Sequence, residues 1–229
     1  MFDGYLTIQN ILGALVGGYL LGSIPFALVA ARFRGVDIFN TGSRTAGTAN
    51  VFWNIGRRIG AAVFVGDVAK GSAAVLLAGL LDVPWSLALL AGGAAILGHW
   101  KSIFAGFRGG DGMATLIGVT VTLEPVLATM GGLIGLVALL VLWRSPSRSA
   151  LALTASFTVM LGVSQYSQID RDMVMGLVAL AMLVIFRSAV FHRRRADAPV
   201  EQESMELVLE LDQHADQTSD VGPAAPENR

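Results

Sequence analysis

Long apolar runs constrain this chain more than any other feature of its sequence. Residues 11–31 contain no charged side chain, and a run of this length can cross the hydrocarbon core of a bilayer as a helix. Further apolar runs lie at residues 59–81, 83–98, 112–123, 126–143, 149–164 and 173–186. The chain is 54% hydrophobic, which is too apolar for a soluble domain of its length. We therefore predict an all-α, polytopic membrane bundle of about seven transmembrane helices.

The charges between these runs predict how the chain is oriented in the membrane. With seven spans, the basic residues of the loops fall on one side, and Arg171 is the exception. The acidic residues on the other side are Asp3, Asp82, Glu124, Asp170 and Asp172. Because cytoplasmic loops are enriched in Lys and Arg, we expect an outside N-terminus and a cytoplasmic C-terminus. Joining residues 112–143 into one helix would give six spans and disrupt this separation of charge.

The last part of the chain differs sharply in composition from the part before it. Residues 196–229 hold nine acidic residues and a single arginine, together with several prolines. Such a segment buries too little apolar surface to form a core. We expect two parts: a transmembrane domain at residues 1–195, and an acidic, disordered cytoplasmic tail at residues 196–229.

Two glycine-rich polar stretches interrupt the apolar pattern and suggest a phosphate site. The first covers residues 42–60 and begins GSRTAGTAN; the second covers residues 98–115 and contains FRGGDGMAT. Glycine lets backbone N–H groups approach a ligand closely, and arginine provides charge suited to phosphate. Both stretches fall on the predicted cytoplasmic side, where phosphorylated metabolites are dissolved. One composite pocket on that face is the simplest arrangement.

Few other residues point to chemistry. Asp67 and Lys70 stand three residues apart within an apolar run, so they share a helix face and can form a structural ion pair or part of a site. His99 is a candidate general base or phosphate ligand, and equally a helix-end hydrogen-bonding residue. The chain has no cysteine, and no spacing of metal ligands is evident. The basic runs lack the interleaved aromatic residues of a nucleic-acid binder, so no nucleic-acid partner is expected.

Across residues 5–195 the chain resembles the bacterial acyl-phosphate:glycerol-3-phosphate acyltransferases of the PlsY type. The resemblance rests on ordered motifs with similar spacing. They are Gly22-Ser-Ile-Pro-Phe26, Gly42-Ser43, Gly47, Asn50-Val51, Gly56, Asp67-x-x-Lys70-Gly71, Gly98-His99, Phe107, Gly109-Gly110, Gly112 and Ala114-Thr115. Together these motifs are much more specific than a single glycine-rich match.

The resemblance implies transfer of a fatty acyl group from acyl phosphate to the 1-hydroxyl of glycerol 3-phosphate, which yields lysophosphatidic acid for phospholipid synthesis. It implies a bacterial inner-membrane protein that meets both substrates and membrane lipid, with no coenzyme A, metal or other cofactor. The catalytic residues it implies are Ser43, Asn50 and His99. The substrate-binding residues expected from the matched motifs and the nearby arginines are Gly42, Arg44, Gly47, Arg57, Lys70, Arg108, Gly109, Gly110 and Gly112.

The chain departs from this family at several positions of the polar loops. Arg44-Thr45 replaces Gly-Asn, Thr48-Ala49 inverts the usual order, Trp53 replaces an arginine, and Asp111 replaces a lysine. Asp111 reverses a local charge where a phosphate is expected to bind. We expect that nearby arginines, Arg44 and Arg108 above all, replace the lost positive charge.

Two other functions fit parts of the same sequence. A catalytically degenerate paralogue that binds lipid or a partner protein would explain why substitutions cluster in the polar loops while the scaffold glycines remain. A small transporter would use Asp67 and Lys70 as a charged switch inside the membrane. The transporter leaves both glycine-rich stretches unexplained.

Overall fold

A computed structural model describes residues 2–145, 148–165 and 170–190, and every element within them is helical. The helices are α1 (Phe2–Ser23), α2 (Phe26–Phe33), α3 (Thr48–Asn54), α4 (Arg57–Leu80), α5 (Trp85–Trp100), the 3₁₀ turn η1 (Ile103–Ala105), α6 (Met113–Leu123), α7 (Pro125–Val141), α8 (Arg148–Ser164) and a last helix, Arg171–Val190. Residues Met1–Ser188 form one unit, which holds the contacts described below. The tail predicted at residues 196–229 lies outside the described residues.

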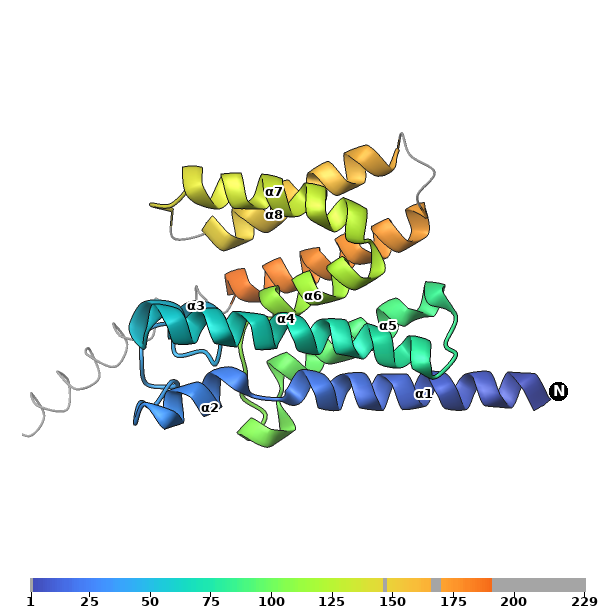
Figure 1. Ribbon diagram of the computed structural model, residues 1–229, viewed down its shortest axis with the longest axis horizontal. Coiled ribbons are helices and arrows are strands. Elements are labelled where there is room, and N and C mark those ends of the chain that lie inside the picture. The colour runs from blue at the N-terminus through green and yellow to red at the C-terminus, as the bar shows by residue number, and fades with distance from the viewer. Residues whose placement is uncertain (1, 146–147, 166–169, 191–229) are drawn as a thin grey trace, which may run out of the picture. The chain divides into compact units, whose positions relative to one another are not determined.

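The predicted all-α membrane bundle is confirmed (Figure 1). Six of the seven predicted apolar runs each fall on one helix, and the first, residues 11–31, is divided between α1 and α2. Within the described residues, four stretches are long and apolar enough to cross a membrane: Thr7–Phe33, Arg57–Leu80, Trp85–Ala105 and Arg171–Val190. Helices α6, α7 and α8 are shorter. With 11 residues, α6 is only about 16 Å long, so it cannot span the hydrocarbon core alone.

The first predicted span is not one continuous helix, as we had expected for residues 11–31. Helix α1 ends at Ser23 and α2 begins at Phe26. Pro25 has no N–H group to donate, and its ring disfavours a helical conformation at Ile24. The break leaves the Ile24 carbonyl without its helical partner, and the Lys70 ammonium donates a hydrogen bond to it at 3.1 Å.

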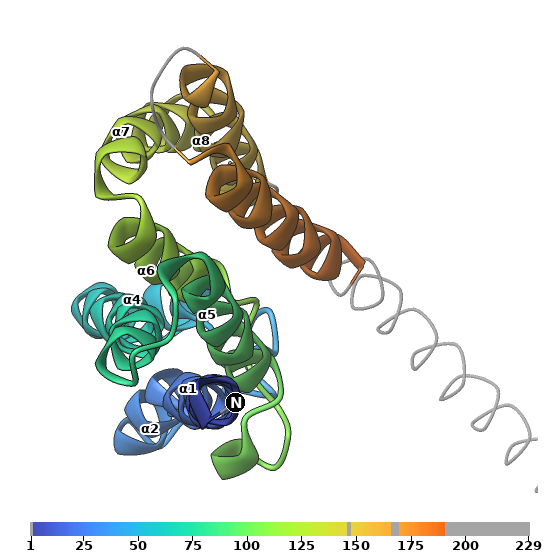
Figure 2. The same ribbon diagram turned by 90° about the vertical axis from the view of Figure 1, so that its right-hand side faces the viewer.

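Glycines allow the helices around α4 and α5 to approach closely. A Cβ atom at Gly18 or Gly22 of α1 would collide with backbone carbonyls of α5, and one at Gly98 would collide with α1. Gly118 of α6 meets the backbone of α4 in the same way, and Ser72 of α4 donates to its carbonyl at 3.0 Å. Packing on small residues is the usual way for helices to associate in lipid. Figure 2 shows the result, with α1 lying beside α4 and α5.

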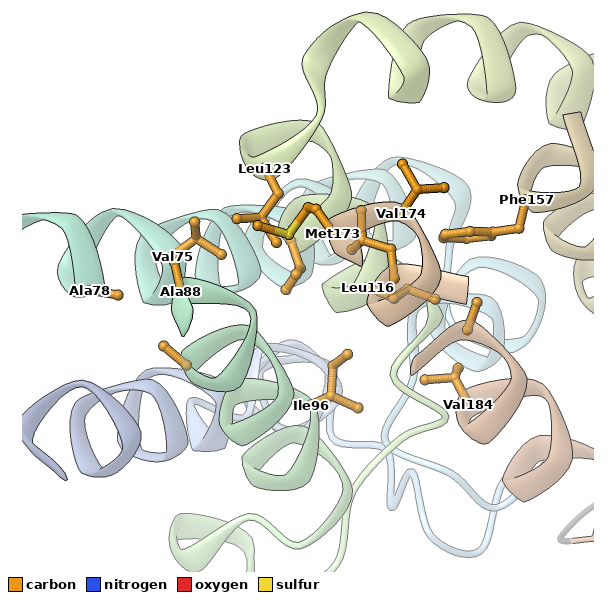
Figure 3. Close-up of a cluster of buried hydrophobic side chains, with 14 of the residues drawn as sticks. Val75, Ala78, Ala88, Ile96, Leu116, Leu123, Phe157, Met173, Val174 and Val184 are labelled. Carbon is orange, nitrogen blue, oxygen red and sulfur yellow. The ribbon is translucent and has the colours of Figure 1, made fainter. Parts of the chain in front are cut away.

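An apolar core connects these helices to the C-terminal part of the bundle. Val75, Leu116 and Leu123, from α4 and α6, face Met173 and Val174 of the last helix (Figure 3). The outward sides of the helices are also apolar, with many exposed Leu, Val and Phe side chains. A chain with apolar residues both inside and outside suits a lipid environment.

Candidate active site

Three charged or titratable side chains meet inside the bundle. Asp67 and Lys70 of α4 and His99 of α5 are only 1%, 4% and 6% exposed. One Asp67 carboxylate oxygen lies 2.9 Å from the Lys70 ammonium and 3.6 Å from His99 Nδ1. The other oxygen accepts a hydrogen bond from the Thr48 hydroxyl at 3.1 Å. Buried charges are costly unless paired, and here the Asp67 carboxylate is the common partner of the other groups.

A small cleft, with room for about one water molecule, opens onto this group. Its lining comes from the break between α1 and α2, from α4 and α5, and from both glycine-rich stretches. The lining residues are Gly22, Ser23, Ile24, Pro25, Phe26, Ala46, Asp67, Lys70, His99, Ser102, Arg108 and Gly109. The cleft therefore combines a buried cation, a histidine and an arginine with polar backbone groups, which suits an anionic substrate.

The first glycine-rich stretch is organised around Asn50, which is 3% exposed on α3. Its amide nitrogen donates to the carbonyls of Ile38, Thr41 and Thr45 at 2.9 to 3.2 Å. Its amide oxygen accepts from the Ser43 N–H at 3.2 Å and from Asn54 at 2.9 Å. Asn50 thus holds the conformation of the loop, because both polar atoms of its side chain form hydrogen bonds within the loop and to α3. The Ser43 hydroxyl is hydrogen-bonded to the Thr45 hydroxyl at 2.9 Å.

The two glycine-rich stretches meet, as expected for one composite pocket. The Ala46 N–H donates to the Gly109 carbonyl at 3.3 Å, and the Gly110 N–H donates to the His99 carbonyl at 3.2 Å. A Cβ atom at Gly110 would lie 2.5 Å from both the Ala46 carbonyl oxygen and His99 Nε2. A side chain at this position would therefore push the two loops and His99 apart.

The predicted site residues separate into three groups. Lys70, His99, Arg108 and Gly109 line the cleft. A second group lies in the two glycine-rich stretches but is not among the lining residues: Gly42, Ser43, Gly47, Asn50, Gly110 and Gly112. Of these, Gly112 adopts φ +89° before α6. Arg44 and Arg57 are exposed and are not among the lining residues.

Arg108 holds a position that a phosphate-binding residue would need. Its guanidinium carbon lies 3.7 Å from the centre of the Phe39 ring, so the second stretch is stacked on the segment before the first. Stacking uses the face of the guanidinium and leaves its N–H edge available for hydrogen bonds. Arg108 therefore brings positive charge to the cleft.

Sequence reasoning missed Arg187, which it treated only as a marker of topology. Arg187 comes from the last helix, donates to the Gly110 carbonyl at 2.8 Å and lies 4.7 Å over the Trp100 ring. Trp100 in turn donates to the Asp111 carbonyl at 2.7 Å. The last helix thus fixes the second glycine-rich stretch. Its 77-residue separation from Gly110 left no local signal for this contact.

Comparison with known proteins agrees with this arrangement. A family model described as glycerol-3-phosphate acyltransferase matches residues 12–196. The chain is 36% identical to a glycerol-3-phosphate acyltransferase of Geotalea daltonii, over 76% of the chain and 87% of the relative. It is 41% identical to the Rhizobium meliloti enzyme of that name, over 70% of the chain and 78% of the relative.

Two solved structures share the fold. They are crystal structures of PlsY, an integral membrane glycerol 3-phosphate acyltransferase, in its glycerol 3-phosphate and lysophosphatidic acid forms. The chain is 32% and 30% identical to them, with TM-scores of 0.67 and 0.65, over 84% of this chain and 92% of the solved ones. The family match covers most of the chain and both comparisons agree. This multi-pass integral membrane protein belongs to the glycerol-3-phosphate acyltransferase family.

Proposed function

We propose that the cleft at Asp67, Lys70 and His99 is where this acyltransferase moves a fatty acyl group from an acyl phosphate to the 1-hydroxyl of glycerol 3-phosphate. The hydroxyl oxygen attacks the acyl carbonyl carbon and forms the ester bond. The bond from that carbon to the phosphate oxygen breaks, and inorganic phosphate leaves with the proton lost by the hydroxyl. The products are lysophosphatidic acid and phosphate.

One observation carries this proposal: a buried Lys–Asp–His group opens onto a cleft walled by both glycine-rich stretches and Arg108. Lys70 and Arg108 provide positive charge for substrates that each bear a phosphate. The N–H group of Gly109, which lines the cleft, has no acceptor among the described residues, so it remains as a donor for a phosphate or for the oxyanion. The Gly110 N–H already donates a hydrogen bond to the His99 backbone carbonyl.

His99 is suited to handle the hydroxyl proton. Its Nδ1 faces the Asp67 carboxylate, which favours the tautomer with hydrogen on Nδ1. Nε2 then has a lone pair to accept the proton and pass it to the leaving phosphate. Ser43 adds a hydroxyl in the adjoining loop, and we assign Asn50 the task of holding that loop in place.

We further propose that the protein lies in the bacterial inner membrane with its N-terminus outside, so that the cleft faces the cytoplasm. The support is the distribution of basic residues among the loops. The loops that carry the cleft are at the end of α1 and α4 opposite the N-terminus (Figure 1). A cytoplasmic cleft would receive soluble glycerol 3-phosphate directly.

The test is a turnover measurement on purified protein in lipid. Palmitoyl phosphate or palmitoyl coenzyme A is supplied with labelled glycerol 3-phosphate, and labelled lysophosphatidic acid is followed over time. We expect product with the acyl phosphate and none with the thioester. Lys70→Met and His99→Ala should each reduce turnover at least a hundredfold, the scale of one charge-assisted contact or one proton-transfer residue. Product from the thioester alone, or none from folded, monodisperse protein, would contradict the proposal.

A further inference from the structure

A cluster of two arginines and two tryptophans lies away from the cleft lining, where the start of α8 contacts α3. We call Trp53, Trp143, Arg144 and Arg148 the arginine–tryptophan cluster. The Arg148 guanidinium lies 4.7 Å over the Trp53 ring and donates to the Trp143 carbonyl at 2.6 Å. The Arg144 guanidinium lies 5.2 Å over the Trp143 ring. Trp53 and Trp143 are 57% and 62% exposed, so the cluster is on the surface.

No carboxylate of the described residues neutralises the positive charge of this cluster. Within residues 2–145, 148–165 and 170–190, neither Arg144 nor Arg148 forms an ion pair with a carboxylate. Cation–π stacking holds each guanidinium by its face and leaves N–H groups at its edge directed to the surroundings. Paired arginines of this kind bind phosphate oxygens with charge-assisted hydrogen bonds.

An apolar surface leads directly to the cluster. Leu133, Leu136, Val137, Leu140 and Val141 of α7 are all exposed, and α7 ends two residues before Trp143. In a membrane protein such a face contacts acyl chains, and tryptophan followed by arginine marks the level of the lipid headgroups. A ligand that combines acyl chains with a phosphate therefore fits this surface better than a soluble anion does.

We propose that the arginine–tryptophan cluster binds the phosphate headgroup of an anionic phospholipid from the surrounding bilayer, whose acyl chains lie along α7. The site is separate from the proposed reaction and does not depend on it. It has a structural connection to the first glycine-rich stretch, because Trp53 lies on α3 three residues after Asn50. A bound lipid would hold α3 against the α7–α8 connection.

Native mass spectrometry of the purified protein tests the proposal by titration with phosphatidylglycerol, with phosphatidylcholine as the neutral comparison. We expect preferential binding of phosphatidylglycerol that falls about 25-fold in Arg144→Gln/Arg148→Gln, or about fivefold per arginine. The matched control is Arg32→Gln/Arg34→Gln, which removes the same charge from exposed residues near the end of α2. The control should change binding less than twofold.

Two results would overturn the assignment. Equal losses in both double variants would mean that the lipid responds to net charge and not to this cluster. Displacement of phosphatidylglycerol by inorganic phosphate at equal concentration would mean a soluble-anion site. Arg148→Gln loses the hydrogen bond to the Trp143 carbonyl and could fail to fold for that reason. In that case the single variant Arg144→Gln tests the proposal, because the contact described for Arg144 is with the Trp143 ring.

Discussion

At the scale of single residues, Asn50 and Ser43 differ in role, although the family resemblance implies that both are catalytic. Asn50 uses its whole amide to hold surrounding backbone, whereas Ser43 contributes one hydroxyl at the loop surface. We predict that Asn50→Ala lowers the free energy of unfolding by about 2–3 kcal/mol, because buried carbonyls lose their donor.

The measurement is the apparent melting temperature in detergent, taken together with turnover. In Ser43→Ala, the control for this position, the melting temperature should stay close to that of the wild type while turnover decreases. An Asn50→Ala protein that melts like the wild type but has no activity would show that Asn50 acts on the substrate.

Asp67 gives a second prediction at this scale. Asp67→Asn removes the charge partner of a buried ammonium, which costs about 3–5 kcal/mol. The double variant Asp67→Asn/Lys70→Met removes both charges, and we expect it to regain much of the lost stability while remaining inactive. A thermal unfolding series on the wild type, Asp67→Asn, Lys70→Met and the double variant measures the coupling. If the two substitutions are simply additive, the pair is not the structural unit described here.

At the scale of elements, the approach of α1 to α5 depends on glycine. Gly22→Ala would place a methyl group against the Ala95 carbonyl and force the helices apart, which costs about 1–3 kcal/mol. The matched control is Gly132→Ala in α7, where nothing lies within 4 Å of the added carbon. The control should be neutral or more stable by up to about 1 kcal/mol through helix propensity. Comparable melting temperatures for both variants would contradict close packing at Gly22.

The elements also show what sequence can and cannot predict. Apolar runs identified the helices because lipid exposure demands apolar side chains along their length. Pro25 is a visible signal for the break after Ser23, yet the apolar run continues through it, so the run alone predicts one span. The meeting of Asp67 with His99 depends on how α4 and α5 are rotated about their axes. No local pattern specifies that rotation, since distant packing contacts determine it.

At the scale of the whole molecule, the proposed orientation can be tested directly, because the chain has no cysteine. Single cysteines at Ser86 and Arg34 would both be exposed, the first at the start of α5 and the second at the end of α2. In intact cells we predict that a membrane-impermeant maleimide labels Ser86→Cys, and labels Arg34→Cys only after permeabilisation. The reverse pattern would place the cleft outside the cytoplasm.

The assembled bundle brings arginines from distant parts of the chain to the region of the cleft. Asp111 and Trp53 stand where the family resemblance predicts basic residues. Arg108 of the second glycine-rich stretch lines the cleft, and Arg187 of the last helix supports that stretch from outside it. Arg187 is far from His99 in sequence, and Arg108 is nine residues after it in a loop, so helix packing determines how close both arginines lie to His99.

The most direct measurement is an experimental structure of this protein with glycerol 3-phosphate bound. We predict that its phosphate lies within hydrogen-bonding distance of the Arg108 guanidinium and the Gly109 N–H, with the 1-hydroxyl directed to His99 Nε2. Glycerol 3-phosphate bound outside the cleft, away from both Lys70 and Arg108, would contradict the assignment of this cleft as the site of acyl transfer.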